Sequence, residues 1–339
     1  MSLTAAALRR VAVMVQAAAV AGLATYLALG AGWPWLPALT LALIAVLVGF
    51  GVSVASAFGA TLLGFGIPAS ARPPLPADAL PCRPLSPLSP LSALACFLYE
   101  CQSVFRMFNW LQPFRSQLTI AQPARPLADA PHVLLVHGYG CNHAIWLDLA
   151  PTLAQAGYCC EAIDLEPVLG DIDTYAPQLL ARMHAIAART GRAPLLVCHS
   201  MGGLAARAAQ VLATRAHSTD RAPPCAGIVT LGTPHHGCAL ARFGQGRNAW
   251  QMRWNSPWLA ALADAETPTM RSRLVSVFSW HDSIAGPPGT SWLDGAHHLA
   301  LAGIGHVSLL RHPHAIDATL AALAMLATQP TALPQTVPQ

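Results

Sequence analysis

Hydrophobic residues form one long uninterrupted block near the start of the chain. Residues 11–71 contain no charged side chain, and a membrane-spanning helix needs about 20 consecutive apolar residues. The block therefore has room for two such helices, which we predict over residues 11–31 and 36–67. Gly32-Trp33-Pro34-Trp35 separates them, because glycine and proline interrupt a helix and tryptophan favours a membrane surface. The pattern predicts a transmembrane hairpin over residues 1–71.

From residue 132 onward, short apolar runs alternate with longer helical segments rich in alanine and leucine. Such runs are typical of parallel strands buried on both faces, and the segments between them suit crossover helices. We therefore predict an α/β domain over residues 131–330, built on a doubly wound, mostly parallel sheet. Functional groups of such sheets gather at the carboxyl ends of the strands. The predicted strands cover residues 132–136, 158–165, 194–198, 227–231, 274–278 and 298–302.

A segment of different texture, residues 72–130, joins the hairpin to the α/β domain. Prolines are dense in residues 72–90, which predicts a semi-rigid linker, since proline removes backbone donors and prevents a packed helix. Residues 91–111 then show apolar side chains at helical spacing. We expect this helix to pack against the α/β domain or the membrane surface. Residues 331–339 form a tail.

Composition supports contact with lipid. The chain is 54% hydrophobic and 10% charged, whereas an ordinary soluble domain has roughly 25% charged residues. Its net charge of +4 comes from scattered arginines, which excludes a nucleic-acid-binding surface. The nine cysteines include no Cys-x-x-Cys pair, so we expect neither a disulfide framework nor a zinc site. Free thiols favour a reducing compartment.

The arginines that flank the apolar block predict its orientation. Arg9 and Arg10 precede the first segment, and Arg72 and Arg83 follow the second. Positive residues stay on the cytoplasmic side, so we predict a bacterial inner-membrane protein whose α/β domain is cytoplasmic. Two alternatives stay open. A cleaved signal peptide also begins with arginines and an apolar run, although the second segment would still anchor the protein. If the first segment did not insert, the α/β domain would lie on the opposite side.

Candidate chemistry begins at Ser200. The sequence Cys198-His-Ser-Met-Gly-Gly203 follows a predicted strand and opens a predicted helix. A serine on so sharp a turn exposes its hydroxyl at the sheet edge, and the residues two before and two after it must be small. Gly202 meets that demand on one side. Cys198 stands where glycine is usual, and cysteine is also small. We predict that Ser200 is a nucleophile.

A glycine-rich bend, His137-Gly138-Tyr139-Gly140, ends the first predicted strand. Backbone amides in such a bend can donate hydrogen bonds to the oxyanion that develops when an ester carbonyl is attacked. The amide of Met201, the residue after the nucleophile, is expected to act together with one amide of this bend. We assign that second amide to Tyr139.

Residues 132–326 resemble the α/β-hydrolase lipases and esterases of bacteria, especially small triacylglycerol-lipase-like enzymes. The resemblance covers nearly all of the α/β domain and none of the hairpin. It implies an α/β-hydrolase fold and a nucleophile, an acid and a base in that chain order, which Ser200, Asp282 and His306 follow. The matching stretches are Val136-His-Gly-Tyr-Gly-Cys-Asn142, Cys198 to Gly203, Leu231-Gly-Thr-Pro-His-His-Gly237, His281-Asp282 and Gly303-Ile-Gly-His306-Val-Ser-Leu-Leu310.

The positions of the predicted strands lead to the same acid and base. Asp282 lies just beyond a late strand, whereas Asp294, the other candidate, comes too late to leave that strand's end. His306 lies in a glycine-flanked loop between the last strand and a terminal helix. His235 and His236 also follow a strand, and we expect them at the rim of the pocket, as in the resembling lipases.

Together these residues predict an acyl-enzyme mechanism. Ser200 attacks an ester carbonyl, His306 transfers protons and Asp282 orients the histidine. No metal or organic cofactor is needed. The apolar and aromatic residues 243–262 would serve as a lid or pocket wall for acyl chains, or they pack in the core. With the hairpin, they favour a lipid-like ester. The rival functions are a thioesterase or acyltransferase with the same triad, and an inactive membrane scaffold of hydrolase fold.

Overall fold

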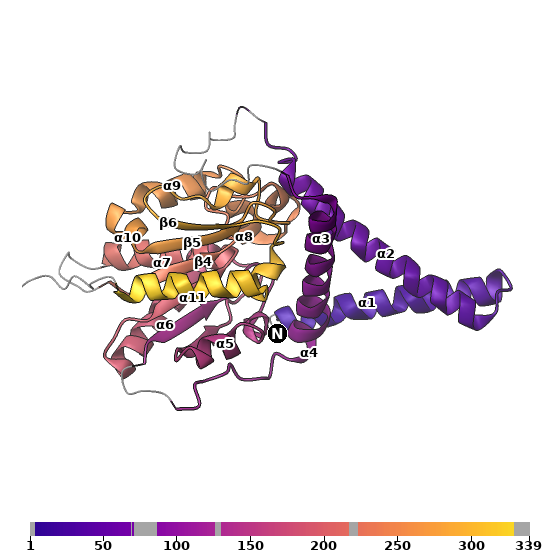
Figure 1. Cartoon of the computed structure of the whole chain (residues 1–339), viewed down its shortest axis with the longest axis horizontal. Helices are drawn as coiled ribbons and strands as arrows, with labels where there is room; N and C mark the ends of the chain where they lie inside the picture. The colour runs from indigo at the N-terminus through magenta and orange to yellow at the C-terminus, as the bar shows by residue number, and fades with distance from the viewer. Residues whose placement is uncertain (1–3, 69, 71–86, 126–129, 217–222, 329–339) are drawn as a thin grey trace, which may run out of the picture.

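Six parallel strands form one sheet in the computed structural model (Figure 1), which describes residues 4–68, 70, 87–125, 130–216 and 223–328. The strand order is β2-β1-β3-β4-β5-β6, and every neighbouring pair is parallel. The predicted doubly wound α/β fold is therefore confirmed. The strands are β1 (His132–Val136), β2 (Cys159–Ile163), β3 (Leu195–His199), β4 (Gly227–Leu231), β5 (Leu274–Ser279) and β6 (His297–Leu301).

The strand order brings two candidate segments together beside β1. The chain runs from β1 to β2 on one side and then crosses to β3 on the other. Ligands of open α/β sheets bind where the strand order reverses in this way, at the carboxyl ends of the strands. The register pairs Val136, the last residue of β1, with Cys198 near the end of β3. The bend that begins at His137 and the turn at Ser200 are therefore neighbours.

Apolar side chains cover both faces of the sheet, as expected for strands that lack polar alternation. Leu134 and Val136 pack with α6 (Ile172–Thr190) and α7 (Met201–Ala216) on one face. Val133 and Leu135 pack on the other face, in the core that includes α5 (Ala150–Gln155) and α11 (Pro313–Thr328). Shorter helices fill the connections: η5 (His143–Trp146), η6 (Ala239–Phe243), α8 (Gly246–Gln251), α9 (Pro257–Ala265), α10 (Pro268–Ser272), η7 (Pro288–Ser291) and η8 (Val307–Leu310).

Two long apolar helices project from the sheet domain and return to it (Figure 1). The first, α1 (Ala5–Thr25), continues as a short π-helix, η1 (Tyr26–Gly30). The second, α2 (Trp35–Leu62), packs against it. Both are long and apolar enough to cross a membrane, and most of their side chains are exposed rather than buried in a protein core. The predicted pair of apolar helices is present.

The start of α1 differs from the prediction. The helix begins at Ala5 rather than at residue 11, because the Thr4 hydroxyl caps it by accepting a backbone hydrogen bond from the first turn (3.3 Å). Arg9 and Arg10 therefore lie within the helix. The guanidinium of Arg9 donates to the backbone carbonyl of Gly140 (3.0 Å), and that of Arg10 donates to the backbone carbonyl of Pro113 (2.7 Å).

A third helix lies across the base of the hairpin (Figure 1). It comprises α3 (Pro90–Phe105), a π-helical stretch η4 (Arg106–Leu111) and the short α4 (Gln112–Phe114), so the helix predicted over residues 91–111 is confirmed. Met107 and Leu111 are buried in the same core as Val133 and Leu135. The predicted linker, residues 72–90, lies almost wholly outside the described residues, and so does the tail.

The two-faced core predicts the effect of removing one buried side chain. Leu134 of β1 is fully buried against helices α6 and α7. Leu134→Ala should therefore lower the free energy of unfolding by about 2–5 kcal/mol. The same change at Leu169, which is 38% exposed, should alter it by less than about 0.5 kcal/mol. Denaturant unfolding of the purified protein in detergent, followed by tryptophan fluorescence, measures both. Equal effects would contradict this core.

Candidate active site

Ser200 lies between the end of β3 and the start of α7. Its φ angle is +54°, in the left-handed region that costs a non-glycine residue about 1–3 kcal/mol. Three hydrogen bonds hold this conformation. The Ser200 amide donates to the carbonyl of Leu231 (2.9 Å), and the Ser200 carbonyl accepts from the Thr233 hydroxyl (2.8 Å) and the Gly203 amide (3.1 Å). The sharp turn expected from the sequence is present at this serine.

Steric limits on both sides of the turn explain the small residues there. A Cβ atom on Gly202 would lie 2.5 Å from the carbonyl oxygen of Val136 and 2.7 Å from that of His137. Both distances are clashes, and these backbone atoms cannot move to relieve them. Cys198 is fully buried and pairs with both β1 and β4 in the middle of the sheet. Burial raises the pKa of its thiol well above the usual value, so Cys198 acts as a small neutral filler.

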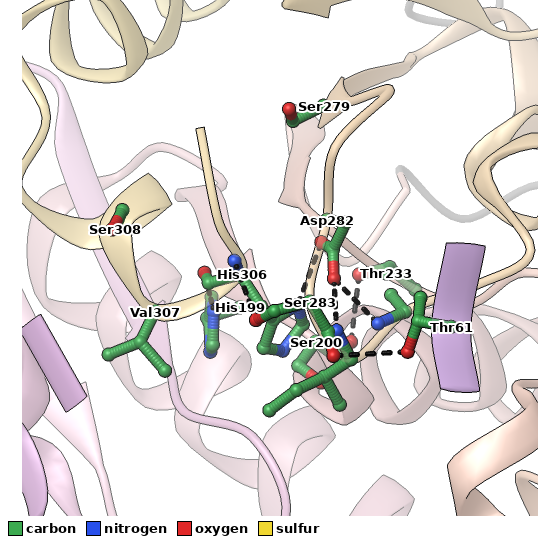
Figure 2. A network of polar contacts seen from close by, with 12 residues as sticks. Thr61, His199, Ser200, Thr233, Ser279, Asp282, Ser283, His306, Val307 and Ser308 are labelled. Carbon is green, nitrogen blue, oxygen red and sulfur yellow. Dashed lines mark hydrogen bonds and ion pairs between the residues drawn. The ribbon is translucent and has the colours of Figure 1, made fainter. Parts of the chain in front are cut away.

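Asp282 and His306 meet at the same edge of the sheet (Figure 2). The ring Nδ1 of His306 lies 2.8 Å from Oδ2 of Asp282, and both side chains are almost completely buried. The amides of Ile284 and Ala285 donate to the other carboxylate oxygen, at 2.7 and 2.6 Å. Gly232, the residue after β4, packs directly against this pair. A Cβ atom there would lie 2.9 Å from Oδ2 of Asp282, so the position has no room for a side chain.

The hydrogen bond to Asp282 determines the tautomer of His306. An ionised carboxylate can only accept, so Nδ1 carries the proton and Nε2 keeps a lone pair. Burial lowers the pKa of His306, but the charge and hydrogen bond of Asp282 and the charge of Glu100 outweigh it, and the pKa lies above its usual value. The protonated form of His306 is therefore stabilised.

The side chain of His137 fixes the bend after β1 through hydrogen bonds. This histidine is buried; its Nε2 accepts from the Leu165 amide (2.9 Å) and its Nδ1 donates to the carbonyl of Gly138 (2.9 Å). A Cβ on Gly138 would lie 2.9 Å from Cβ of Ser200, so the backbone of the bend passes directly beside the serine. Tyr139 is in this bend, and Met201 begins α7 on the other side of the serine.

The alternative candidates for the acid and the base, Asp294, His235 and His236, make contacts other than the Asp282–His306 hydrogen bond. Asp294 is exposed on the loop before β6. His235 is buried against the guanidinium of Arg207 (3.2 Å), and His236 lies 2.9 Å through Nε2 from the carbonyl of Trp292. Within the described residues, no group of three or more His, Cys, Asp or Glu side chains could hold a metal ion.

The segment 243–262 divides into a buried and an exposed part. Met252, Leu259 and Leu262 belong to the core, whereas Phe243 and Trp250 are 64% and 40% exposed. The segment starts beside the bend that follows β1, because the Tyr139 hydroxyl donates to the carbonyl of Gln245 (2.8 Å) and accepts from its amide (3.0 Å). Core packing, one of the two expected roles, is therefore present for part of the segment, and a lid or pocket wall stays a prediction for the exposed residues.

Sequence reasoning did not identify Glu100. This residue of α3 is fully buried and accepts hydrogen bonds from the loop that carries His306. It is the single acidic residue in residues 90–114. An acid in an otherwise apolar helix is a signal that could have found it, because glutamate is almost never fully buried unless it is paired.

Comparison with known proteins identifies a matching family and similar solved structures. Residues 133–338 match the model of a family described as Alpha/beta hydrolase family. The mature Bacillus licheniformis lipase BlEst2 has a TM-score of 0.51 and 19% identity, over 62% of this chain and 97% of that one. Aspergillus fumigatus lipase B has a TM-score of 0.49 and 16% identity, over 63% of this chain and 57% of that one. Curated protein sequences give no match.

The packing around Cys198 generates a test of the turn. Cys198→Gly should leave ester hydrolysis nearly unchanged, since a smaller residue fits the buried position. Cys198→Leu adds volume to a site that is already fully buried, and it should abolish activity by displacing the strained backbone at Ser200. Hydrolysis of p-nitrophenyl butyrate by equal amounts of each folded variant is the measurement. A leucine variant with full activity would mean that this turn does not carry the nucleophile.

Proposed function

The chain belongs to the alpha/beta hydrolase family, and on that premise we propose that it is a membrane-anchored serine hydrolase that cleaves carboxylic esters. One observation carries the proposal. The buried hydrogen bond between Asp282 and His306 (2.8 Å) lies at the same sheet edge as the left-handed turn at Ser200. A nucleophile, a base and an acid that orients the base are the three groups that acyl transfer through a serine requires.

In the proposed mechanism, Nε2 of His306 accepts the proton of the Ser200 hydroxyl as its oxygen attacks the ester carbonyl. Asp282 keeps the proton on Nδ1 and stabilises the imidazolium that forms. The histidine then protonates the leaving alcohol, which departs and leaves an acyl-enzyme. In the second half, His306 removes a proton from water, which attacks the acyl group and regenerates Ser200.

The developing negative charge on the carbonyl oxygen needs donors that are already in place. We assign this role to the backbone amides of Tyr139 and Met201. Gly138 allows the bend to pass beside Ser200, and Met201 is the first residue of α7, where helix amides carry partial positive charge. Removal of one such donor costs on the order of 10²–10³-fold in kcat in serine hydrolases.

The surroundings of the site favour a lipid-like ester. Phe243 is exposed and stacks with Phe65, which follows α2, at a centroid distance of 6.2 Å. This pair links the end of the hairpin to the segment that contacts Tyr139 through Gln245. Apolar and aromatic groups at the rim of a site suit acyl chains.

Membrane anchoring is supported by the exposed faces of the helices. The apolar side chains of α1 and α2 lie largely uncovered, which in water would be a large unfavourable surface. Helix α3 adds a stripe of exposed residues at helical spacing on the side opposite Glu100: Leu91, Leu94, Leu98 and Phe105. A helix that crosses the base of the hairpin with such a stripe is suited to lie in the membrane surface.

Substitution of the three proposed catalytic residues tests the function. Ser200→Ala should lower esterase activity by about 10⁴-fold or more while the fold persists. Asp282→Asn should be comparably damaging, because it removes the charge that holds the His306 tautomer. Asp294→Asn is the matched control: the exposed residue should tolerate the change. The measurements are kcat/KM for p-nitrophenyl esters of graded chain length and labelling of Ser200 by a fluorophosphonate.

Each outcome separates the candidate functions. Fluorophosphonate labelling with no ester turnover, but with turnover of an acyl thioester, would replace the esterase by a thioesterase. Neither labelling nor turnover would leave an inactive scaffold of hydrolase fold. If Asp294→Asn were the damaging change, the acid would be misassigned.

The orientation of the hairpin has its own test. Arg9 contacts the sheet domain at Gly140, and Arg10 contacts Pro113 of α4 next to it, which supports placing the start of α1 and the sheet domain on one side of the membrane. Arginines resist transfer across a bilayer, so we expect that side to be cytoplasmic. A fluorescent protein fused after Gln339 should fold and fluoresce, whereas alkaline phosphatase fused at the same point should be inactive. Phosphatase activity would instead indicate a periplasmic enzyme.

A further inference from the structure

We propose that Glu100 is a positioning residue for His306, supplied by helix α3 from outside the part of the chain that matches the hydrolase family. This inference rests on the proposed function, because it assigns a second buried carboxylate to the same base. Glu100 does not contact the reacting atoms. It acts through the loop that carries the histidine.

Four donors converge on the Glu100 carboxylate. Oε1 accepts from the Ser283 hydroxyl (2.5 Å) and the Val307 amide (3.0 Å), and Oε2 accepts from the amide and the hydroxyl of Ser308 (2.9 and 2.6 Å). The residues immediately after His306 are thus tied to α3. Because a carboxylate can accept at both oxygens while carrying no donor, only the ionised form satisfies all four groups.

Ser283 joins this carboxylate to both the loop of Asp282 and the loop of His306. It follows Asp282 directly, its hydroxyl donates to Glu100, and the same oxygen accepts from the His306 amide (3.3 Å). The carbonyl of Ser283 accepts from the Thr61 hydroxyl at the end of α2 (3.0 Å). The loop of Asp282 and the loop of His306 are therefore fastened to each other, to helix α3 and to the end of helix α2.

Close packing leaves the base loop little freedom. A Cβ on Gly305, the residue before His306, would lie 2.4 Å from the carboxyl carbon of Glu100. The backbone on both sides of the histidine is consequently in contact with one buried side chain. Orientation of a general base matters because a misplacement of about 1 Å can cost on the order of 10²-fold in rate.

Glu100 also contributes charge, together with the other titratable groups that face His306. Asp282 binds the ring directly, and the ring of His199 packs at a centroid distance of 4.6 Å. Burial and the charge of His306 lower the pKa of His199 well below its usual value, so His199 is neutral. Cys96 of α3 is also neutral, since burial and the two carboxylates raise its pKa to about 12. The charges that act on the base are those of Asp282 and Glu100.

The test compares Glu100→Gln with the wild-type full-length protein in detergent. Glutamine keeps the size of the side chain but removes the charge and one acceptor oxygen. We expect kcat for p-nitrophenyl butyrate to fall by about 10–10²-fold with KM nearly unchanged. The acid limb of the kcat/KM profile reports the pKa of the base in the free enzyme. Because Glu100 raises that pKa, the limb should move to lower pH in the variant.

Glu266→Gln is the matched control. Glu266 is also a buried carboxylate, with 2% exposure, but its partners are Arg207 and Arg271, away from His306. Its substitution should lower the melting temperature without moving the acid limb. A folded Glu100→Gln variant with unchanged kcat and an unchanged acid limb would overturn the proposal, and so would an equal shift of the limb in Glu266→Gln.

A second pair of variants covers the case in which Glu100→Gln does not fold. Ser283→Ala and Ser308→Ala each remove one neutral donor to Glu100, and we expect each to lower kcat several-fold with no shift of the acid limb. Full activity in both would overturn the proposal. Ser200→Ala in the same assay keeps the two inferences apart. If that variant stayed active, the serine mechanism itself would fail, whatever the result at Glu100.

Discussion

Burial of carboxylates is the constraint on which the arrangement of this protein depends. Asp282 and Glu100 are 1% and 0% exposed, and a carboxylate removed from water is tolerated only where donors surround it. The donors come from consecutive residues of two loops, those after β5 and β6. Neither loop can move away without leaving a buried charge unpaired, so the position of His306 follows from the need to satisfy both acids.

The sheet could be predicted from the sequence because its information is local. Each strand is a short apolar run, and Ser200 and His306 lie in glycine-containing segments next to such runs. Glu100 could not be assigned a role in this way, since its partners at Val307 and Ser308 lie 207 and 208 residues away in the chain. Periodicity indicates that a residue faces inward, but not which distant loop it meets.

The arginines of α1 show a second limit of sequence reasoning. Arg9 and Arg10 entered the prediction only as charges that flank an apolar segment. In the structure they also donate to specific backbone carbonyls, and Arg9 lies over the ring of Phe108 at 4.1 Å from its centroid. The predicted domain boundary at residue 131 remains a prediction. Met107 and Leu111, which precede it, share a core with β1.

The contact between Arg9 and Gly140 spans 131 residues, which has a consequence for the order of assembly. The start of α1 is synthesised before its partner carbonyl, which follows roughly ten seconds later at ordinary elongation rates of about 5–20 residues per second. During that interval both apolar helices have been synthesised, and the guanidinium of Arg9 does not yet have the carbonyl of Gly140 to bind. Both apolar helices are therefore synthesised before the bend that contains Gly140, and the sheet domain folds against helices that have already been made.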